Sequence, residues 1–340
     1  MRPGIPGEDP KPNRDTEMLT LAGKRVVVTG GAGFLGRVLV AKLRERGVSE
    51  IFVPRRKEFD LTRHADVVRL YGEARPQVVF HLAAEVGGIG ANKAHPGRFF
   101  YANAAMGLHL IEAGRLHGVE RFVQTGTICT YPKFAPVPFR EEDNWNGYPE
   151  ETNAPYGVAK KALQVMLAAY RDEYGFDGVY VLPVNLYGPG DNFHRESSHV
   201  IPSMIRRMTE ARDAGDDAIA IWGTGEVTRE FLYVDDCAEG LLLAAERLTD
   251  SEPVNLGTGR EIRVADLSRL VADGVGFRGE LRFDPTKPEG QPRRCLDTRR
   301  AEERMGFRAT VDLEEGLRRT ITWFEQQQRA GAIREVVYGE

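Results

Sequence analysis

Tyr156 and Lys160 stand four residues apart in the segment APYGVAKK, a spacing that puts both side chains on one face of a helix. An ammonium group beside a phenol favours the phenolate, and such a phenol exchanges protons with a sugar hydroxyl or a ketone near neutral pH. Thr127, in the preceding segment TGTICTYPK, carries a hydroxyl that can donate a hydrogen bond to the same substrate oxygen. These three residues predict proton transfer at a hydroxyl or ketone oxygen.

A glycine-rich turn, VVVTGGAGFLG, lies near the start of the chain. Gly30, Gly33 and Gly36 fall between a β-branched run and a helical pattern, where glycines permit a tight turn and close approach of the backbone to a phosphate. The N-terminus of the following helix then faces a pyrophosphate. The alternative is a simple tight turn, but the place of the glycines in a βαβ series favours a dinucleotide site.

The end of the second predicted strand bears on which dinucleotide binds. An enzyme that prefers NAD usually has Asp or Glu there, whereas VPRRKEFD offers Arg55 and Arg56. Two cations favour a 2′-phosphate, and we expect Arg56 to be its contact. Alternatively, both arginines belong to a solvated strand end. We therefore predict NADP(H) as the cofactor, with NAD as the alternative.

The elements that position these residues begin at Lys24, where short β-branched runs start to alternate with helical patterns. Strands are predicted at RVVVTG, EIFVP, VVFHLA, RFVQTGT and VYVLPV, and helices at LVAKLRERG and at about 64–74, 104–117 and 156–174. This alternation implies right-handed βαβ units and a parallel sheet. We predict an α/β fold in which residues 22–190 form a doubly wound Rossmann domain, to which the chain returns at about 229–257.

After NLYGPGDNF the rhythm changes to a helix (VIPSMIRRMTEAR), a strand (AIAIWG), a helix after VDDCAEG, a strand (PVNLG) and the run EIRVADLSRLV. The final helical stretch carries Leu313, Leu317, Ile321 and Phe324 at a spacing that buries one face. We predict that residues 191–340 form, for the most part, a smaller α/β domain that binds the substrate.

Composition narrows the classes of function. The chain has 340 residues and a formal net charge of -4, so its overall charge indicates neither nucleic acid nor an anionic membrane as a partner. Its three cysteines lack disulfide-framework or metal-ligand spacing, so we expect a reducing compartment and no metal. Residues 1–21 are predicted to be a flexible tail, and no later apolar run reaches the length of a membrane span. We expect a cytoplasmic protein.

Together these residues resemble the extended short-chain dehydrogenase/reductases over nearly the whole chain after the tail. The strings AAEVGGIGAN, CTYPK, EETNAPYGVAK, NLYGPGDNF, SSHVIP and TREFLYVDD are similar in order and spacing to the GDP-L-fucose synthase family. This resemblance implies an epimerase and reductase that converts GDP-4-keto-6-deoxy-D-mannose to GDP-L-fucose with NADPH. It implies Tyr156 as the proton donor, Lys160 as its electrostatic partner and ribose anchor, and Thr127 as the third member, where the family usually has Ser.

The resemblance also assigns an epimerising pair, Cys129 and His199. Inversion beside a ketone removes a proton from one face and returns one to the other, which a thiolate and an imidazolium can do. Taken singly, a lone Cys is more often a small buried apolar residue and a lone His more often structural.

Two sets of binding residues complete the expected site. For the nucleotide diphosphate of the substrate, the resemblance implies Asn185, Arg207, Trp222, Arg229 and Lys287. The expected cofactor-binding set is Gly30, Gly33, Phe34, Leu35, Gly36, Arg55, Arg56, Asp60, Ala83, Ala84 and Lys160.

Two other functions stay open at this stage. A redox-neutral nucleotide-sugar epimerase, such as the GDP-mannose 3,5-epimerases, carries a similar CxYP segment and retains a bound NAD. A cofactor-binding sensor without catalysis generally lacks the Tyr and Lys pair, which this chain has. The helices at about 104–117 and 156–174 resemble the pair through which the family forms two-fold dimers, so we expect a homodimer.

Overall fold

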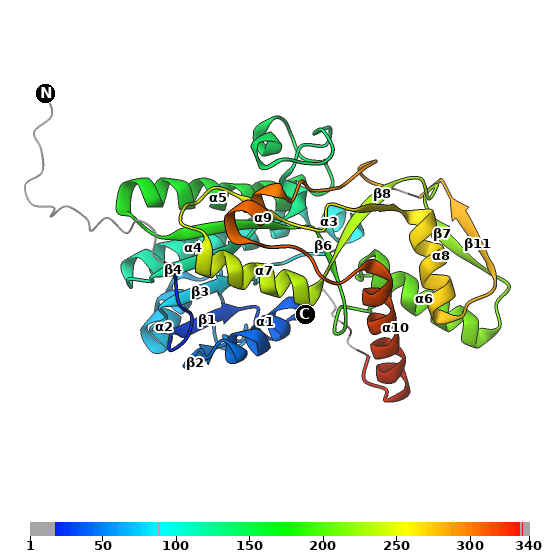
Figure 1. The fold of residues 1–340 in the computed structure, drawn as a ribbon, viewed down its shortest axis with the longest axis horizontal. Coiled ribbons are helices and arrows are strands. Elements are labelled where there is room, and N and C mark those ends of the chain that lie inside the picture. The colour runs from blue at the N-terminus through cyan, green and yellow to red at the C-terminus, as the bar shows by residue number, and fades with distance from the viewer. Residues whose placement is uncertain (1–17, 88, 288, 334, 336–340) are drawn as a thin grey trace, which may run out of the picture.

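The structure is a computed structural model that describes residues 18–87, 89–287, 289–333 and 335 (Figure 1). Of the predicted tail, 1–21, residues 1–17 lie outside the described residues. Its last residues are packed, because Leu21 is 1% exposed and the Leu19 amide donates to the Glu246 carbonyl at 2.8 Å. The folded part of the chain therefore begins before residue 22.

The predicted parallel sheet is confirmed. Among the described residues it has six strands, in the order β2-β1-β3-β4-β5-β9, and every neighbouring pair is parallel. The strands are β1 (Arg25–Thr29), β2 (Glu50–Phe52), β3 (Val78–His81), β4 (Arg121–Thr125), β5 (Gly178–Pro183) and β9 (Val254–Leu256). Strand order changes direction between β1 and β3, and a doubly wound sheet binds its ligand beyond the carboxyl ends of the strands at such a point.

Helices cover both faces of this sheet (Figure 1). On one face α4 (Pro96–Leu116) packs along α5 (Ala154–Tyr174), and on the other α1 (Phe34–Glu45) packs along α7 (Val234–Arg247). A Cβ atom at Gly107 would lie 2.2 Å from Leu163 Cδ1, so glycine allows α4 and α5 to approach closely. The smaller helices are α2 (His64–Ala74), α3 (Ile89–Ala94) and α9 (Arg299–Met305). The helix expected after VDDCAEG begins instead at Val234, so that segment forms its first two turns.

The second part of the chain has its own hydrophobic core, in which α6, α8 and α10 meet through residues such as Ile205, Leu267 and Phe324. Its helices are α6 (Val200–Ala214), α8 (Val264–Val275) and α10 (Leu313–Arg329). Its strands are β6 (Asn185–Tyr187), β7 (Ala218–Trp222), β8 (Thr228–Tyr233), β10 (Glu261–Arg263) and β11 (Glu280–Asp284). They form a sheet of order β10-β8-β6 and a parallel pair of β7 with β11.

The chain crosses between the two cores more than once. Helix α7 and strand β9 lie in the main core, and so do Leu296, Met305 and Phe307, which lie past the end of the predicted return at 229–257. None of the helices among the described residues combines the length and the apolar character that a membrane span needs.

Candidate active site

The glycine turn forms a cradle that no larger residue would fit. Gly30 has a φ of 72°, and a Cβ atom there would lie 2.9 Å from the Ala83 backbone nitrogen. A Cβ atom at Gly36 would lie 2.2 Å from the Gly30 carbonyl oxygen. In the part of the chain that the structure describes, no side chain caps α1, which starts after Gly33, so its first amides face outward. This cradle fits the pyrophosphate of a dinucleotide.

The other predicted cofactor residues lie around this cradle. Phe34 and Leu35 open α1, and Ala83 and Ala84 directly follow β3. The Ala83 amide donates to Thr29 Oγ1 at 3.3 Å, so the segment after β3 is fixed against β1. Ala83 therefore borders the cradle beside Gly30.

Arg56, which follows β2, lies beside a carboxylate that was not predicted. Arg56 Nη2 lies 3.2 Å from Glu85 Oε1, and Arg98 Nε donates to Glu85 Oε2 at 2.6 Å. The Arg56 side chain is 69% exposed and Arg55 is also exposed, so both guanidinium groups are reachable by an anion. Asp60, which was predicted to bind cofactor, accepts from the Thr62 hydroxyl at 2.7 Å, and this bond lowers the pKa of its carboxyl group.

Thr127 and Cys129 share one short turn, the 3₁₀ helix η1 (Ile128–Thr130). Thr127 Oγ1 accepts from the Cys129 amide at 3.2 Å, which leaves the threonine hydroxyl hydrogen available to another acceptor. Helix α5 packs against this turn, because a Cβ atom at Gly157 would lie only 2.3 Å from the Cys129 carbonyl oxygen. Glycine at the position after Tyr156 therefore lets the tyrosine and the cysteine turn lie on adjacent elements.

Lys160 is buried, with 1% of its surface exposed. Burial lowers its pKa from 10.5 to about 8. Its ammonium group donates to the Thr125 carbonyl at 3.1 Å, at the carboxyl end of β4. Burial first, and then the charge of Lys160, lowers the pKa of His81 well below its ordinary value. The lysine is thus mostly protonated at pH 7, and His81 beside it is neutral, mainly because it is buried.

Cys129 is the partly accessible cysteine of the three, since Cys237 and Cys295 are buried and burial raises the pKa of both thiols. Two arginines that come from the second part of the chain face it. Arg294 Nη1 lies 3.8 Å from Cys129 Sγ. Burial, and after it the charge of Arg294, lowers the pKa of Arg229 to about 10, whereas Glu289 and Cys129 act in the opposite direction. Sequence reasoning did not single out Arg294.

His199 precedes α6, where its carbonyl accepts from the Ser203 amide at 3.0 Å. Its side chain is exposed to solvent, and partial desolvation by the surrounding protein lowers its pKa below 6.5. In the free protein the imidazole is therefore mostly neutral at pH 7. Among the described residues, no hydrogen bond joins His199 to Cys129.

The five predicted substrate residues form two groups. In one, Arg207 Nη2 donates to the Ala220 carbonyl at 2.5 Å, and Lys287 Nζ lies 6.0 Å from the ring centre of Trp222, which is 59% exposed. In the other, Arg229 is near Cys129. The Asn185 amide donates to the Glu230 carbonyl at 3.1 Å.

Glu289, which was not predicted, connects the two groups. Its carbonyl accepts from Arg229 Nη2 at 2.6 Å, and its carboxylate accepts from the Thr224 hydroxyl at 2.6 Å, two residues beyond Trp222. The segment around Glu289 is therefore shared by both groups.

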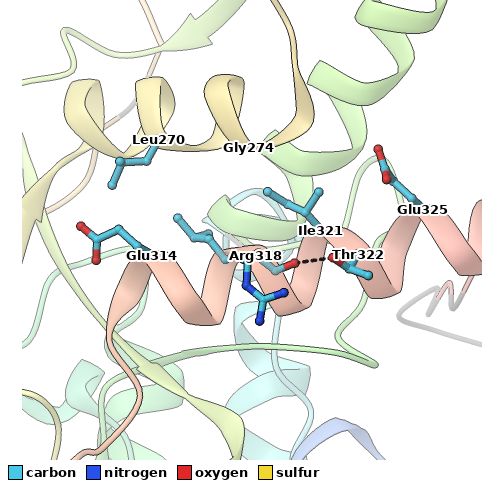
Figure 2. Close-up of a pocket in the computed structure, with 8 residues that line it drawn as sticks. Leu270, Gly274, Glu314, Arg318, Ile321, Thr322 and Glu325 are labelled. Atoms are coloured by element: carbon cyan, nitrogen blue, oxygen red, sulfur yellow. Dashed lines mark hydrogen bonds between the residues drawn. The ribbon is translucent and has the colours of Figure 1, made fainter.

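A separate hollow lies between α8 and α10 and contains none of the predicted site residues (Figure 2). It is lined by Leu270, Gly274, Glu314, Leu317, Arg318, Ile321, Thr322 and Glu325. Its polar side chains are on α10, where the Thr322 hydroxyl donates to the Arg318 carbonyl at 2.8 Å. Among the described residues no cluster of His, Cys, Asp and Glu could hold a metal ion.

Comparison with known proteins shows which family the chain is similar to. Residues 26–257 match the model of the "NAD dependent epimerase/dehydratase family". GDP-L-fucose synthase 1 of Arabidopsis thaliana is 39% identical over 300 residues, which cover 88% of this chain and 93% of that protein. GDP-L-fucose synthase of Escherichia coli strain K12 is 36% identical over 90% of this chain and 98% of its own length. A solved GDP-mannoheptose C4 reductase from Campylobacter jejuni with NADP bound superposes with a TM-score of 0.81 at 26% identity, covering 91% of this chain and 99% of that one.

Proposed function

The chain belongs to the family of NAD-dependent epimerases and dehydratases, and from this membership we propose that it converts GDP-4-keto-6-deoxy-D-mannose to GDP-L-fucose with NADPH. The reaction is epimerisation at the third and fifth carbons followed by reduction at the fourth. The observation that carries the proposal is the packing of the Cys129 turn against the helix that bears Tyr156 and Lys160. One site then holds both an epimerising thiol and a reducing phenol.

Epimerisation uses the ketone at the fourth carbon, which acidifies the hydrogens on both neighbouring carbons. The Cys129 thiolate takes a proton from one face as the C–H electron pair moves into an enolate, and His199 returns a proton to the opposite face. Burial lowers the pKa of His199, so its protonated form needs support. The diphosphate of the bound substrate is an anion that favours the imidazolium.

Reduction needs a proton donor at the ketone oxygen. Tyr156 donates its hydroxyl proton there, and the nearby ammonium of Lys160 stabilises the phenolate that remains. The Thr127 hydroxyl donates a hydrogen bond to the same oxygen. NADPH, held at the cradle of Gly30 and Gly36, supplies the hydride to the fourth carbon when it is bound.

The cations of the second part of the chain suit the nucleotide diphosphate. Arg229 and Arg207 offer guanidinium donors to phosphate oxygens, and Lys287 adds a point charge beside Trp222. The exposed indole of Trp222 can stack on the sugar nucleotide. Asn185 completes the proposed set.

The first test is absorbance at the NADPH band while the purified protein is mixed with NADPH and GDP-4-keto-6-deoxy-D-mannose. Stoichiometric oxidation with formation of GDP-L-fucose is expected. No oxidation, with cofactor and substrate intact, would refute the proposal and direct attention to a redox-neutral epimerase that retains NAD.

Two variants separate the chemical steps. Cys129→Ser should lose solvent-deuterium exchange at the third and fifth carbons, whereas Tyr156→Phe should stop NADPH oxidation and keep the exchange. Cys295→Ser, at a buried cysteine, is the matched control and should keep both activities. The reverse pattern for the first two variants would overturn the assigned roles.

We also propose a homodimer formed through α4 and α5, in the cytoplasm. These two helices pack together and carry large apolar side chains in contact with solvent, namely Phe100, Tyr101, Leu108, Leu116, Val165 and Tyr174. Such a patch is typical of a protein interface. Three free cysteines suit a reducing compartment. A monomeric mass by light scattering would contradict the dimer.

A further inference from the structure

Arg294 is a buried cation held against the cysteine turn. It is 9% exposed, and its Nε donates to Gln291 Oε1 at 3.0 Å. Gln291, 4% exposed, donates in turn to the Lys133 carbonyl at 2.7 Å and to the Pro132 carbonyl at 3.3 Å. Since residues 132 and 133 directly follow the Cys129 turn, the guanidinium group is fixed to the same segment that carries the thiol.

 Among the described residues, the charge of Arg294 has no carboxylate partner. The ion pairs of the described residues include none with Arg294, although its neighbour Arg293 pairs with Glu261. A buried cation without a counter-ion is costly, so an anion close to it is stabilised in return.

The charged groups near Cys129 are mainly cationic. Arg294 is in direct contact with the sulfur, and Arg229 is close enough for its pKa to respond to the thiol. The carboxylates of Glu289 and Glu150 also act on Arg229, in the direction that favours its charge. Arg229 donates to the Thr228 and Glu289 carbonyls, whereas Arg294 directs Nη1 at the thiol.

We propose that Arg294 is a positioning residue that holds Cys129 as a thiolate in the free protein, and that Gln291 fixes Arg294 in place. The inference rests on the proposed function, in which the Cys129 thiolate is the base of the epimerisation. A guanidinium group next to a thiol favours the thiolate, which is the nucleophilic and basic form.

The test is the pH dependence of alkylation of Cys129 by iodoacetamide, measured without substrate and mapped to the modified cysteine by peptide mass spectrometry. In the natural protein the rate should reach half of its plateau below about pH 8.5, the ordinary value for a thiol. Arg294→Gln should slow alkylation at pH 7 by about tenfold or more and leave the plateau at high pH unchanged. Arg294→Lys should restore most of the rate at pH 7.

Three controls make the result specific. Arg293→Gln removes a neighbouring cation that is 56% exposed and paired with Glu261, and it should not change the profile. Cys129→Ala gives the background from Cys237 and Cys295, which are both buried. Binding of NADPH reports whether Arg294→Gln is folded.

Two results would overturn the inference: a profile of the natural protein that rises only at or above about pH 8.5, or an unchanged profile in folded Arg294→Gln. The second result would mean that the guanidinium group of Arg294 does not set the protonation state of Cys129. The first needs no variant, so it decides the matter even if Arg294→Gln does not fold. The thiolate of Cys129 could depend on Arg294 in a protein that makes no GDP-L-fucose. That result would refute the proposed function only, and the inference that Arg294 stabilises the thiolate would stand.

Discussion

Lys160→Met should stabilise the protein while it abolishes reduction. Burial lowers the pKa of this lysine from 10.5 to about 8. Each pKa unit corresponds to about 1.4 kcal/mol, so holding the ammonium in the folded state costs about 3 kcal/mol at pH 7. Methionine fills a similar volume without charge and loses one hydrogen bond, worth about 1 kcal/mol. The Thr125 carbonyl keeps a second donor, Gln124 Nε2 at 2.8 Å, so the expected net gain is about 2 kcal/mol.

The expected gain in stability depends on pH. The folded-state pKa of Lys160 lies below the unfolded value, so the cost is fully present below about pH 8 and disappears between about pH 8 and 10.5. The free energy of unfolding of the natural protein should therefore rise relative to that of Lys160→Met by about 2 kcal/mol between pH 7 and pH 9.5.

Urea unfolding at both pH values measures the stability of the two proteins, and NADPH oxidation measures the activity. Lys161→Met is the matched control. Burial also lowers the pKa of Lys161 to about 8, but its ammonium group bonds the Asn144 carbonyl and lies 4.4 Å from the ring centre of Trp145. That variant should keep reduction and gain less stability. A Lys160→Met protein that is no more stable than the natural one at pH 7 would refute the reasoning from burial.

Further predictions concern the cofactor, the interface and the acid. Gly36→Ala should abolish NADPH binding in fluorescence titration, because its Cβ atom would lie 2.2 Å from the Gly30 carbonyl oxygen, whereas Gly72→Ala, with open space around it, should bind normally. Arg56→Ala should weaken NADPH about tenfold and NADH little, since one charge-assisted hydrogen bond is lost; equal losses would contradict a 2′-phosphate contact. Leu108→Glu should give a monomeric mass in light scattering. Deuterium exchange under kcat/KM conditions should decline as pH rises through the lowered pKa of His199, and it should lose this limb in His199→Gln.

Much of the fold and part of the site follow from local signals in the sequence. The β-branched runs and the glycine turn predicted the sheet and its cradle, because each depends on residues close together in the chain. Helix α2 matches its predicted bounds, His64–Ala74. Helix α4 begins at Pro96 rather than near Ala104, since proline suits the first turn of a helix and marks its start.

The environment of the thiol did not follow from the sequence. Arg294 and Cys129 are separated by 165 positions, and no spacing rule connects a cation in PRRC with a cysteine in TICTY. Glu85, Arg98 and Arg56 likewise meet only because β2 and β3 end at the same edge of the sheet. Patterns predicted which residues are reactive, whereas the charged groups that surround those residues come from distant segments of the chain.

Glu230 explains how those distant segments are held at the thiol. This buried carboxylate on β8 accepts from the Gly259 amide at 2.8 Å and from the Leu296 amide at 2.6 Å. It follows Arg229 directly in the chain, and Leu296 lies two residues after Arg294. Burial raises the pKa of Glu230, and these amide donors oppose the rise. The buried carboxylate therefore depends on the hydrogen bonds from these amides to remain charged. One anchor thus sets the position of both guanidinium groups, and a change at Glu230 would reach Cys129 through them without touching substrate or cofactor.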